Sequence, residues 1–223
     1  MSYNNGPRIV TNGLVLHLDA GNSRSIVSGS TTWSDLSRNG YNGQLINGTI
    51  FSSSNGGELV FDGVNDYVNV ASMYNFATTN QLTAIVWAKS SPATWNDYGF
   101  LASKRDQFVM HPTISSREVA YYMRTNAGWE NRNVTPSNIQ IYNQYCMTYN
   151  AGAFVAYLNG LSVTSANLNA TMASDTGDLS IGKDEDHSRY LNGRITIAQF
   201  YNRALTAAEV RQNYHATKGR FGL

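Results

Sequence analysis

The stretch Leu82-Thr-Ala-Ile-Val-Trp-Ala-Lys89 decides the fold of this chain. It is rich in β-branched and aromatic residues, which pack well on a pleated surface and favour a strand. Residues of a strand alternate between the two faces of a sheet, yet this stretch has no polar face over most of its length. We therefore expect Leu82–Lys89 to be a central strand that is buried on both sides.

Short runs of the same kind lie on either side of this strand, and tight turns separate them. Eight Asn-Gly pairs occur, and Asn-Gly is the strongest short hairpin signal because both residues tolerate positive φ angles. The chain shows no alternation of strands with helices and no glycine-rich dinucleotide loop. The sequence therefore predicts an all-β fold, an antiparallel two-sheet jelly-roll sandwich. The other candidate strands are Leu14–Leu18, Glu58–Asp62, Tyr67–Val70, Phe100–Lys104, Gln107–Met110, Val119–Arg124, Tyr145–Tyr149, Ala153–Leu158, Leu179–Ile181 and Arg194–Tyr201.

One short helix is predicted near the C-terminus, where it closes the end of the sandwich. Thr206-Ala-Ala-Glu209 forms a capping box, in which the Thr hydroxyl and the Glu carboxylate each satisfy an amide at the helix start. Val210 and Tyr214 follow four residues apart on one face, and Lys218-Gly219 supply a basic last turn and a C-cap. The tail Arg220–Leu223 is expected to be a surface strand or a docking segment.

Length and composition limit the organisation and the function. The 223 residues contain no linker, so we expect one domain over residues 13–223, preceded by an N-terminal arm over residues 1–12. Charged residues make up 14% of the chain and the net charge is +1, which argues against a nucleic-acid partner. No run approaches the roughly 20 apolar residues that span a bilayer. The single cysteine, Cys146, lies in an apolar strand candidate and is expected to be an inert core thiol.

The N-terminal residues Met1–Arg8 are polar and lack the apolar core of a secretory signal. We therefore expect the chain to be made in the cytoplasm of a host cell, and to stay there or to leave by another route, such as in a released virus particle.

Seven blocks of sequence occur in a fixed order between residue 13 and about residue 215. They are Trp33–Gly43, Gly57–Val68, Leu82–Lys89, Tyr157–Gly160, Ile181–Lys183, Asn192–Ile195 and Tyr201–Glu209. In this order they resemble the laminin-G-like, concanavalin A-like jelly-roll family, and specifically the LamG-type modules of bacterial and phage proteins. The opening Gly13–Asn22 and the ending Tyr214–Leu223 resemble most the version found in structural proteins of tailed phages.

The resemblance implies a fold but leaves several functions open, because the family includes sugar binders, calcium-dependent protein binders, glycoside hydrolases and virion surface proteins. Its hydrolases resemble one another in a Glu-x-Asp-x-x-Glu strand that aims carboxylates into one groove, and retaining chemistry needs two carboxyl groups about 5–5.5 Å apart. No glutamate of this chain has an aspartate two residues later. Glu58 and Asp62 share a strand face but lack an acid partner. We therefore expect a protein that is not an enzyme.

Sugar binding needs flat aromatic faces beside polar groups that satisfy hydroxyls. Three expected long loops carry such residues, and the alternative is that their aromatic rings pack under their own loops or in a subunit contact. The candidate sugar-binding residues are Trp95 and Tyr98 in the loop Ser90–Gly99, Trp129 in the loop Arg124–Asn133, and Asp186 in the loop Lys183–Tyr190.

Calcium is the one cofactor that the resemblance suggests, since LamG-like modules often bind it and calcium takes six to eight oxygen ligands. The alternative is that the acidic residues among the candidate ligands, which are given next, cap backbone amides in turns or pair with Lys183 and Arg189. The candidate metal ligands are Asp62, Asn65, Asp66 and Asp184.

These features predict a non-enzymatic structural or decoration protein of a phage virion, at the capsid surface or on a fibre or tail. The N-terminal arm and the C-terminal tail are the expected docking segments for other virion proteins, and exposed loops are expected to adsorb cell-surface glycans. The alternative is a carbohydrate-binding module or lectin of a bacterial surface protein, with or without calcium. The sequence leaves open whether copies of the chain assemble into a homo-oligomer.

Overall fold

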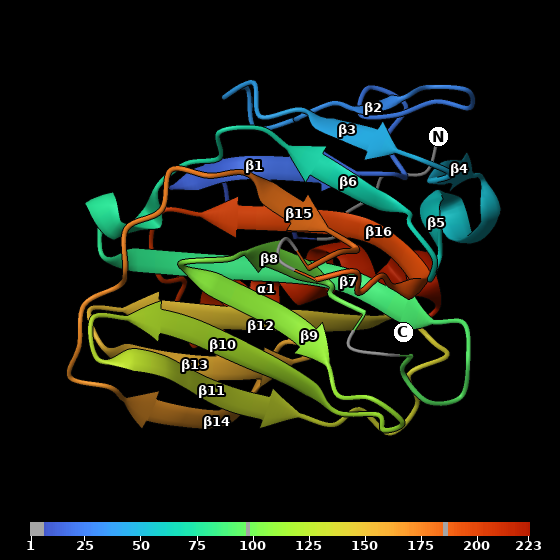
Figure 1. The fold of residues 1–223 in the computed structure, drawn as a ribbon. Helices are drawn as coiled ribbons and strands as arrows, with labels where there is room; N and C mark the ends of the chain where they lie inside the picture. The colour runs from blue at the N-terminus through green and yellow to red at the C-terminus, as the bar shows by residue number, and fades with distance from the viewer. Residues whose placement is uncertain (1–6, 97–98, 185–186) are drawn as a thin grey trace.

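The computed structural model of this protein describes residues 7–96, 99–184 and 187–223. Within those residues two antiparallel sheets of eight strands face one another, and we call them sheet A and sheet B (Figure 1). This arrangement confirms the predicted two-sheet sandwich. Sheet A has the order β14 (Leu161–Asn167), β13 (Ala153–Leu158), β12 (Asn143–Asn150), β7 (Gln81–Ser90), β16 (Asn192–Tyr201), β5 (Glu58–Asp62) and β4 (Ile50–Ser52), with β1 (Leu14–Asp19) also paired to β16. Sheet B has the order β11 (Gly128–Val134), β10 (Val119–Thr125), β9 (Phe108–Pro112), β8 (Ala102–Lys104), β15 (Leu179–Ile181), β6 (Tyr67–Val70), β3 (Gly43–Ile46) and β2 (Thr32–Trp33).

The central strand is β7, which contains the predicted Leu82–Lys89 and lies between β12 and β16. Every residue from Leu82 to Ala88 is buried. Alternate side chains such as Leu82 and Val86 enter the core between the two sheets. Ile85 and Trp87 point the other way and belong to two smaller clusters on the outer face of sheet A. The stretch is apolar on both faces because each face has its own cover.

β16 is the strand on which sheet A closes. It pairs with β7 along nearly its whole length, with β5 at its beginning and with β1 at its end. Strands from the first third of the chain therefore depend on a strand near its C-terminus.

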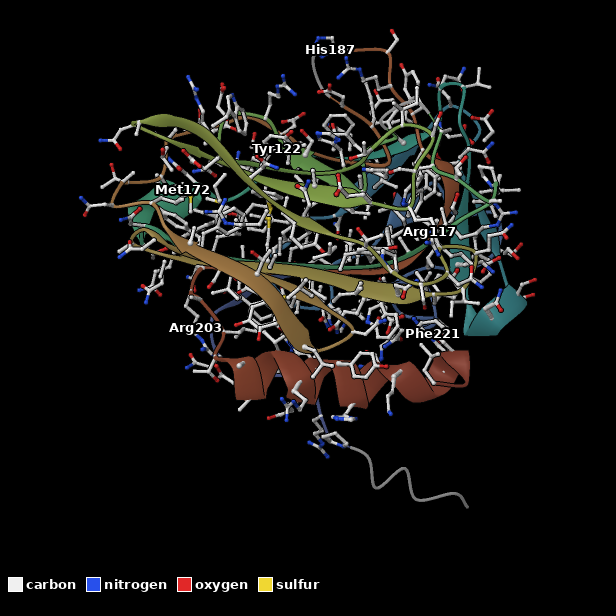
Figure 2. The ribbon with its side chains drawn as sticks, turned by 90° about the horizontal axis from the view of Figure 1, so that it is seen from below. Arg117, Tyr122, Met172, His187, Arg203 and Phe221 are labelled. Atoms are coloured by element: carbon white, nitrogen blue, oxygen red, sulfur yellow. The ribbon has the colours of Figure 1, made fainter. Side chains whose placement is uncertain are left out.

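The helix α1 (Ala207–Thr217) covers the outer face of sheet A, and the predicted capping box at its start is confirmed. Its Tyr214 ring stacks on the Trp87 ring with the centroids 5.6 Å apart. The expected surface strand at the tail is wrong, because η3 (Lys218–Phe221) continues α1 as a 3-10 helix and places Phe221 4.6 Å from Trp87. The helical turn allows the Phe221 ring to pack on Trp87, and burial of that ring stabilises the turn over an extended strand. Figure 2 shows Arg203 beside one end of α1 and Phe221 at the other.

Two further 3-10 turns, η1 (Ser54–Gly56) and η2 (Phe76–Thr78), lie in loops. No helix in the described part of the chain is long and apolar enough to cross a membrane. Cys146 is fully buried on β12, and burial raises the pKa of its thiol far above the usual range, as expected of a core thiol.

The N-terminal residues that the structure describes lie on the same side as α1. The Val10 amide donates to Asn213 Oδ1 at 2.8 Å, and Gln212 Nε2 donates to the Arg8 carbonyl at 2.7 Å. The Tyr201 hydroxyl donates to the Val10 carbonyl at 2.9 Å. Both ends of the described chain therefore pack on the outer face of sheet A, and the domain boundary after residue 12 stays a prediction.

Sequence reasoning misses the strands β2, β3, β4, β11 and β14. The prediction of a long loop over Arg124–Asn133 is wrong, because β10 continues to Thr125 and β11 begins at Gly128. β11 and β14 form edges, and β11 buries one of its seven residues and β14 none, so they lack the apolar alternation that marks a half-buried strand.

Candidate functional site

Sheet B has one face in the core and one face that α1 leaves uncovered. On β9, Phe108 and Met110 pack in the core between the sheets, while Val109 and His111 point to the outer face. Figure 2 shows Tyr122 of β10 on the side of the molecule away from α1. Side chains on this outer face are therefore the ones that a ligand could reach.

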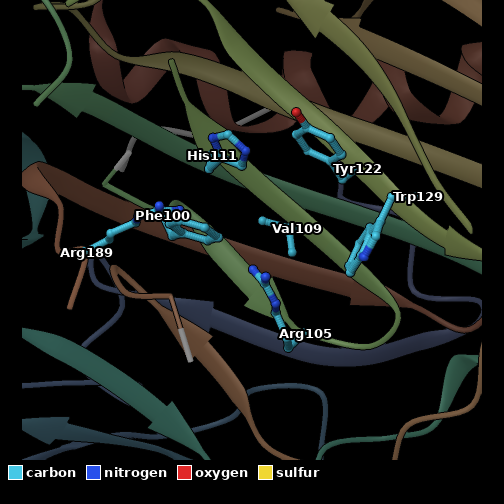
Figure 3. Close-up of a pocket in the computed structure, with 7 residues that line it drawn as sticks. All are labelled: Phe100, Arg105, Val109, His111, Tyr122, Trp129 and Arg189. Carbon is cyan, nitrogen blue, oxygen red and sulfur yellow. The ribbon is translucent and has the colours of Figure 1, made fainter. Parts of the chain in front are cut away.

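A pocket of about 260 Å³ opens on the outer face of sheet B (Figure 3). Its walls come from β9, β10, β11 and the loops beside them, so segments far apart in sequence meet there. Figure 3 shows Val109 among the aromatic side chains, at the centre of the pocket. The lining residues are Phe100, Arg105, Val109, His111, Tyr122, Trp129 and Arg189.

The aromatic rings of the pocket form a row across neighbouring strands. The ring centroids of Phe100 and His111 lie 5.0 Å apart, as do those of His111 and Tyr122, with interplanar angles of 29° and 12°. Trp129 stands nearly perpendicular to Tyr122, at 6.3 Å and 82°. Stacked rings cover one another's faces and hold one another in place, so the row presents edges to the pocket and Trp129 closes its end.

A buried carboxylate holds the two arginines at the pocket wall. The Asp184 side chain is fully buried, and its Oδ1 accepts a hydrogen bond from Arg105 Nη1 at 3.2 Å. Arg189 Nη1 lies 3.8 Å from Asp184 Oδ2, and His187 Nδ1 lies 2.9 Å from the same oxygen. Charge-assisted pairing of this kind fixes guanidinium groups in one orientation.

His111 is a neutral ring at neutral pH. Burial is the largest effect and lowers the pKa of its imidazole, and the hydrogen bond to the Pro112 carbonyl opposes it. The positive charges of Arg189 and Arg105 lower that pKa further, against the negative charge of Asp184. Nδ1 lies 3.0 Å from the Pro112 carbonyl oxygen, which only accepts, so Nδ1 carries the proton. Nε2 is then the acceptor of this ring.

The predicted sugar-binding residue Trp129 lies in this pocket. It is 37% exposed, and the guanidinium groups of Arg105 and Arg124 lie 5.7 Å and 5.5 Å from its ring centroid. A role in sugar binding stays a prediction for this residue.

The prediction for Trp95 is wrong, because this side chain is only 1% exposed and offers no face to a ligand. Its ring packs edge-on against Tyr145, and its Nε1 donates to the Arg117 carbonyl at 3.3 Å. Trp95 therefore packs beneath its own loop, which is the alternative weighed above. Tyr98 and Asp186, the other two candidates, lie outside the described residues.

Sequence reasoning misses Phe100, Arg105, His111, Tyr122 and Arg189. The available signal is alternation along the strands, which turns Val109, His111 and Tyr122 to one face. That signal gives no register between β9 and β10, and the register is what aligns the rings.

The first predicted metal site is a turn whose carboxylates are occupied by backbone amides. Asp66 is buried, and it accepts from the Gly48 amide at 2.8 Å and from the Asp62 amide at 3.1 Å. Asp62 Oδ1 accepts from the amides of Val64 at 2.7 Å and Asn65 at 3.4 Å. Burial, followed by the nearby Asp62 charge, raises the pKa of the Asp66 carboxyl against these amide hydrogen bonds, which is not the setting of a cation ligand.

The second predicted metal ligand, Asp184, is surrounded by the guanidinium groups of Arg105 and Arg189 and by the His187 ring described above. Among the described residues, no three His, Cys, Asp or Glu side chains gather in a way that holds a metal ion. These residues as folded do not fit a calcium ion, and calcium binding stays a prediction.

Glu58, the acid weighed above as a hydrolase residue, belongs to a polar network on sheet A. Its Oε2 accepts from the Tyr142 hydroxyl at 2.6 Å and from Asn55 Nδ2 at 2.7 Å. Lys89 and Arg194 lie 3.7 Å and 3.5 Å from its carboxylate oxygens. The network stabilises the folded chain and lies on the other sheet from the pocket.

A jelly-roll sandwich of two facing antiparallel sheets defines a class of protein by its architecture, the β-sandwich domains with a lectin-like fold. Residues 62–211 match the sequence profile of the concanavalin A-like lectin/glucanases superfamily, of the laminin G type, and the chain belongs to that family. No sequence of a curated protein matches the chain at a significant level.

Three solved structures illustrate the similarity of fold. The binding domain of Paraclostridial Mosquitocidal Protein 1 matches with a TM-score of 0.72 at 16% identity, over 92% of this chain and 52% of that one. The binding domain of botulinum neurotoxin DC in complex with SialylT matches with a TM-score of 0.70 at 12% identity, over 92% of this chain and 51% of that one. A third match is domain 4 of AbnA, an extracellular arabinanase of Geobacillus stearothermophilus, in complex with arabinotriose. Its TM-score is 0.67 at 16% identity, over 90% of this chain and 98% of that one. The chain spans about half the length of the two toxin domains, and at these identities the likeness is one of fold.

Proposed function

We propose that this chain is a carbohydrate-binding module that holds a glycan in the pocket on the outer face of sheet B and performs no chemistry on it. The observation that carries the proposal is the lining of that pocket, where Trp129 and Tyr122 stand beside two oriented arginines on the face of sheet B that lies away from α1 (Figure 2).

The lining suits a sugar because sugars combine apolar C–H faces with closely spaced hydroxyls. Trp129 offers a partly exposed indole against which a sugar face packs. Arg105, Arg189 and the Tyr122 hydroxyl donate to sugar oxygens, and His111 Nε2 accepts from a sugar hydroxyl. The buried Asp184 carboxylate keeps the arginines in place before the ligand arrives, which lowers the entropy cost of binding.

The likeness to known binding domains supports the same proposal. One similar structure, domain 4 of AbnA, holds arabinotriose and is matched over 98% of its length, so a domain of this shape binds a glycan in another protein.

A glycan array followed by calorimetry tests the proposal, with Trp129→Ala and Tyr122→Phe as the site variants. We expect the wild type to bind at least one glycan, and Trp129→Ala to weaken that binding by about tenfold or more, as loss of an anchoring aromatic does. Ile50→Ala is the matched control, because Ile50 is an exposed apolar residue of β4 on the other sheet. The same titration with EDTA tests calcium.

A wild type that binds no glycan, or a Trp129→Ala variant that binds as well as Ile50→Ala does, contradicts the proposal. Incubation with β-glucans tests its non-enzymatic part. We expect no release of reducing ends, and release above that of a heat-denatured sample contradicts this part.

We further propose that the module is displayed on a virion, with the glycan pocket turned outward. The contacts of Arg8 and Val10 with α1, and the packing of Phe221, place both ends on the outer face of sheet A. Docking through these ends leaves the outer face of sheet B free. Immunoblotting of virus particles released from cells that make the protein tests this role, and absence from purified particles contradicts it.

A further inference from the structure

The strands at the borders of the two sheets differ in how they avoid pairing with other strands. A border strand presents unpaired backbone N–H and C=O groups, and proteins protect such strands by shortness, by charged residues, by proline, by a β-bulge or by a covering loop. In sheet A the border strands are β14, β4 and the free side of β1, and in sheet B they are β11 and β2.

Four of these five borders are protected. β4 has three residues and β2 has two. β11 carries Glu130 and Arg132. The loop after β2 covers β1, since the Leu36 amide and the Ser37 hydroxyl both donate to β1 carbonyl groups.

The fifth border, β14, lacks all of these protections except a bulge. It has seven residues, Leu161-Ser-Val-Thr-Ser-Ala-Asn167, and none of them is charged or a proline. One irregularity lies near Val163, and Thr164–Asn167 then pair regularly with Ala153–Ala156. Figure 1 shows β14 at the lower border of the molecule, with no strand beyond it.

The surface beside this border is apolar. Leu161 is 58% exposed and Val163 is 53% exposed, and both are among the largest apolar exposures of the described residues. A hollow of about 260 Å³ lies next to them, between β14 and the start of α1, where Val155 and Ala207 contribute to its lining. Exposed apolar side chains next to unpaired backbone groups mark a site for another strand.

We propose that β14 pairs with β14 of a second copy of this chain, antiparallel about a twofold axis, so that sheet A continues from one copy into the next. Only a strand satisfies a row of backbone groups, which excludes a helix or a small ligand as the occupant. A second copy fits best because two uncharged strands meet without like-charge repulsion. A twofold contact also uses the same border on both copies, so one contact protects both.

The geometry of such a pair has a consequence for the outer face of sheet B. An antiparallel pair in one sheet is related by an axis perpendicular to the sheet, so both copies turn that face the same way. The inference itself rests on β14 alone and does not depend on what the pocket binds.

Sedimentation velocity and equilibrium over a wide range of protein concentration test the proposal. We expect a reversible dimer in the wild type. The double variant Val163→Lys/Ser165→Lys places lysines on exposed positions of β14, and we expect it to weaken dimerisation about tenfold or more. Val27→Lys is the matched control, because Val27 is also 53% exposed but lies in a loop outside both sheets.

Circular dichroism checks that each variant is folded, and Ser165→Lys alone serves if the double variant is not. A wild type that stays monomeric at every concentration overturns the proposal. A dimer that is as tight in the Val163→Lys/Ser165→Lys variant as in Val27→Lys also overturns the proposal. A monomer that instead captures an added extended peptide along β14 overturns the choice of a second copy as the occupant.

Discussion

The start of α1 is held by a charge pair whose removal is expected to destabilise the protein by about 1.5 kcal/mol at neutral pH. Glu209 accepts hydrogen bonds from Arg203 Nη1 at 2.9 Å and Nη2 at 2.6 Å. It also accepts from the Thr206 amide at 2.9 Å, as part of the capping box. The perturbation is Glu209→Gln, which removes the charge and keeps the size and an amide oxygen of the side chain.

The size of the effect follows from the titration of Glu209. The Arg203 hydrogen bonds, helped by those of Thr206, lower the pKa of Glu209 from 4.5 to about 2. At about 1.4 kcal/mol per pKa unit this shift corresponds to roughly 3 kcal/mol. The Glu209 side chain is 27% exposed, and solvent screening reduces the contribution to about half of that.

The sign of the pH dependence follows from the direction of the shift. A carboxyl with a lowered pKa stabilises the folded state above its ordinary pKa, and this stabilisation is lost as the pH falls through the folded value. The difference in unfolding free energy between wild type and Glu209→Gln is therefore largest above about pH 5 and nearly vanishes by about pH 2.

Urea denaturation of both proteins at several pH values measures this difference. Glu130→Gln is the matched control, because Glu130 lies exposed on β11 and its removal is expected to cost less than about 0.5 kcal/mol. A difference for Glu209→Gln that does not change between about pH 6 and about pH 2.5 refutes the reasoning. A difference no larger than that of the control refutes it as well.

Four further outcomes are expected. Gly57→Ala destabilises the protein by more than about 2 kcal/mol in thermal or urea unfolding, because φ is +107° there and a Cβ would lie 2.1 Å from a backbone oxygen. Gly40→Ala, with φ +83° and open space around it, costs about 1 kcal/mol, and equal losses at the two sites would contradict this. Phe221→Ala uncovers Trp87 and lowers the free energy of unfolding by about 2 kcal/mol. Acrylamide then quenches tryptophan fluorescence more strongly, and unchanged quenching would count against the packing described. Cys146 stays unreactive towards a thiol reagent until the protein is unfolded with urea, since burial raises the pKa of its thiol, and rapid reaction of the native protein would contradict this.

The sequence predicts the centre of the sandwich better than its borders. β7 is recognisable because both of its faces are buried and its residues from Leu82 to Lys89 are apolar apart from Thr83 and Lys89. β11 and β14 have one neighbouring strand each, and nearly all their side chains are exposed or half-buried, so nearly any polar residue is tolerated on them. Their strand conformation comes from the ladder with the neighbouring strand, which is a contact between distant parts of the chain.

The candidate site shows the same division. Trp129 is identifiable as a large aromatic residue in a polar segment, and the structure places it in the pocket. Trp95 is also a large aromatic residue in a polar segment, yet it is buried. Tertiary packing decides whether such a ring packs beneath its loop or faces solvent. The row from Phe100 to Tyr122 depends on the pairing of β9 with β10, and a sequence does not state which residues stand opposite one another.

The place of β16 in sheet A sets the order in which this protein can be completed during synthesis. β1, β5 and β7 leave the ribosome early, yet each has β16 as a neighbour. Until residues 192–201 have been made, these three strands expose apolar side chains and backbone groups that the finished sheet covers. Pairing over such long sequence separations is slow, and unpaired strands aggregate, so the growing chain depends on protection by the cell. A shortened chain that ends before Asn192 is therefore an aggregating species rather than a smaller version of the same module.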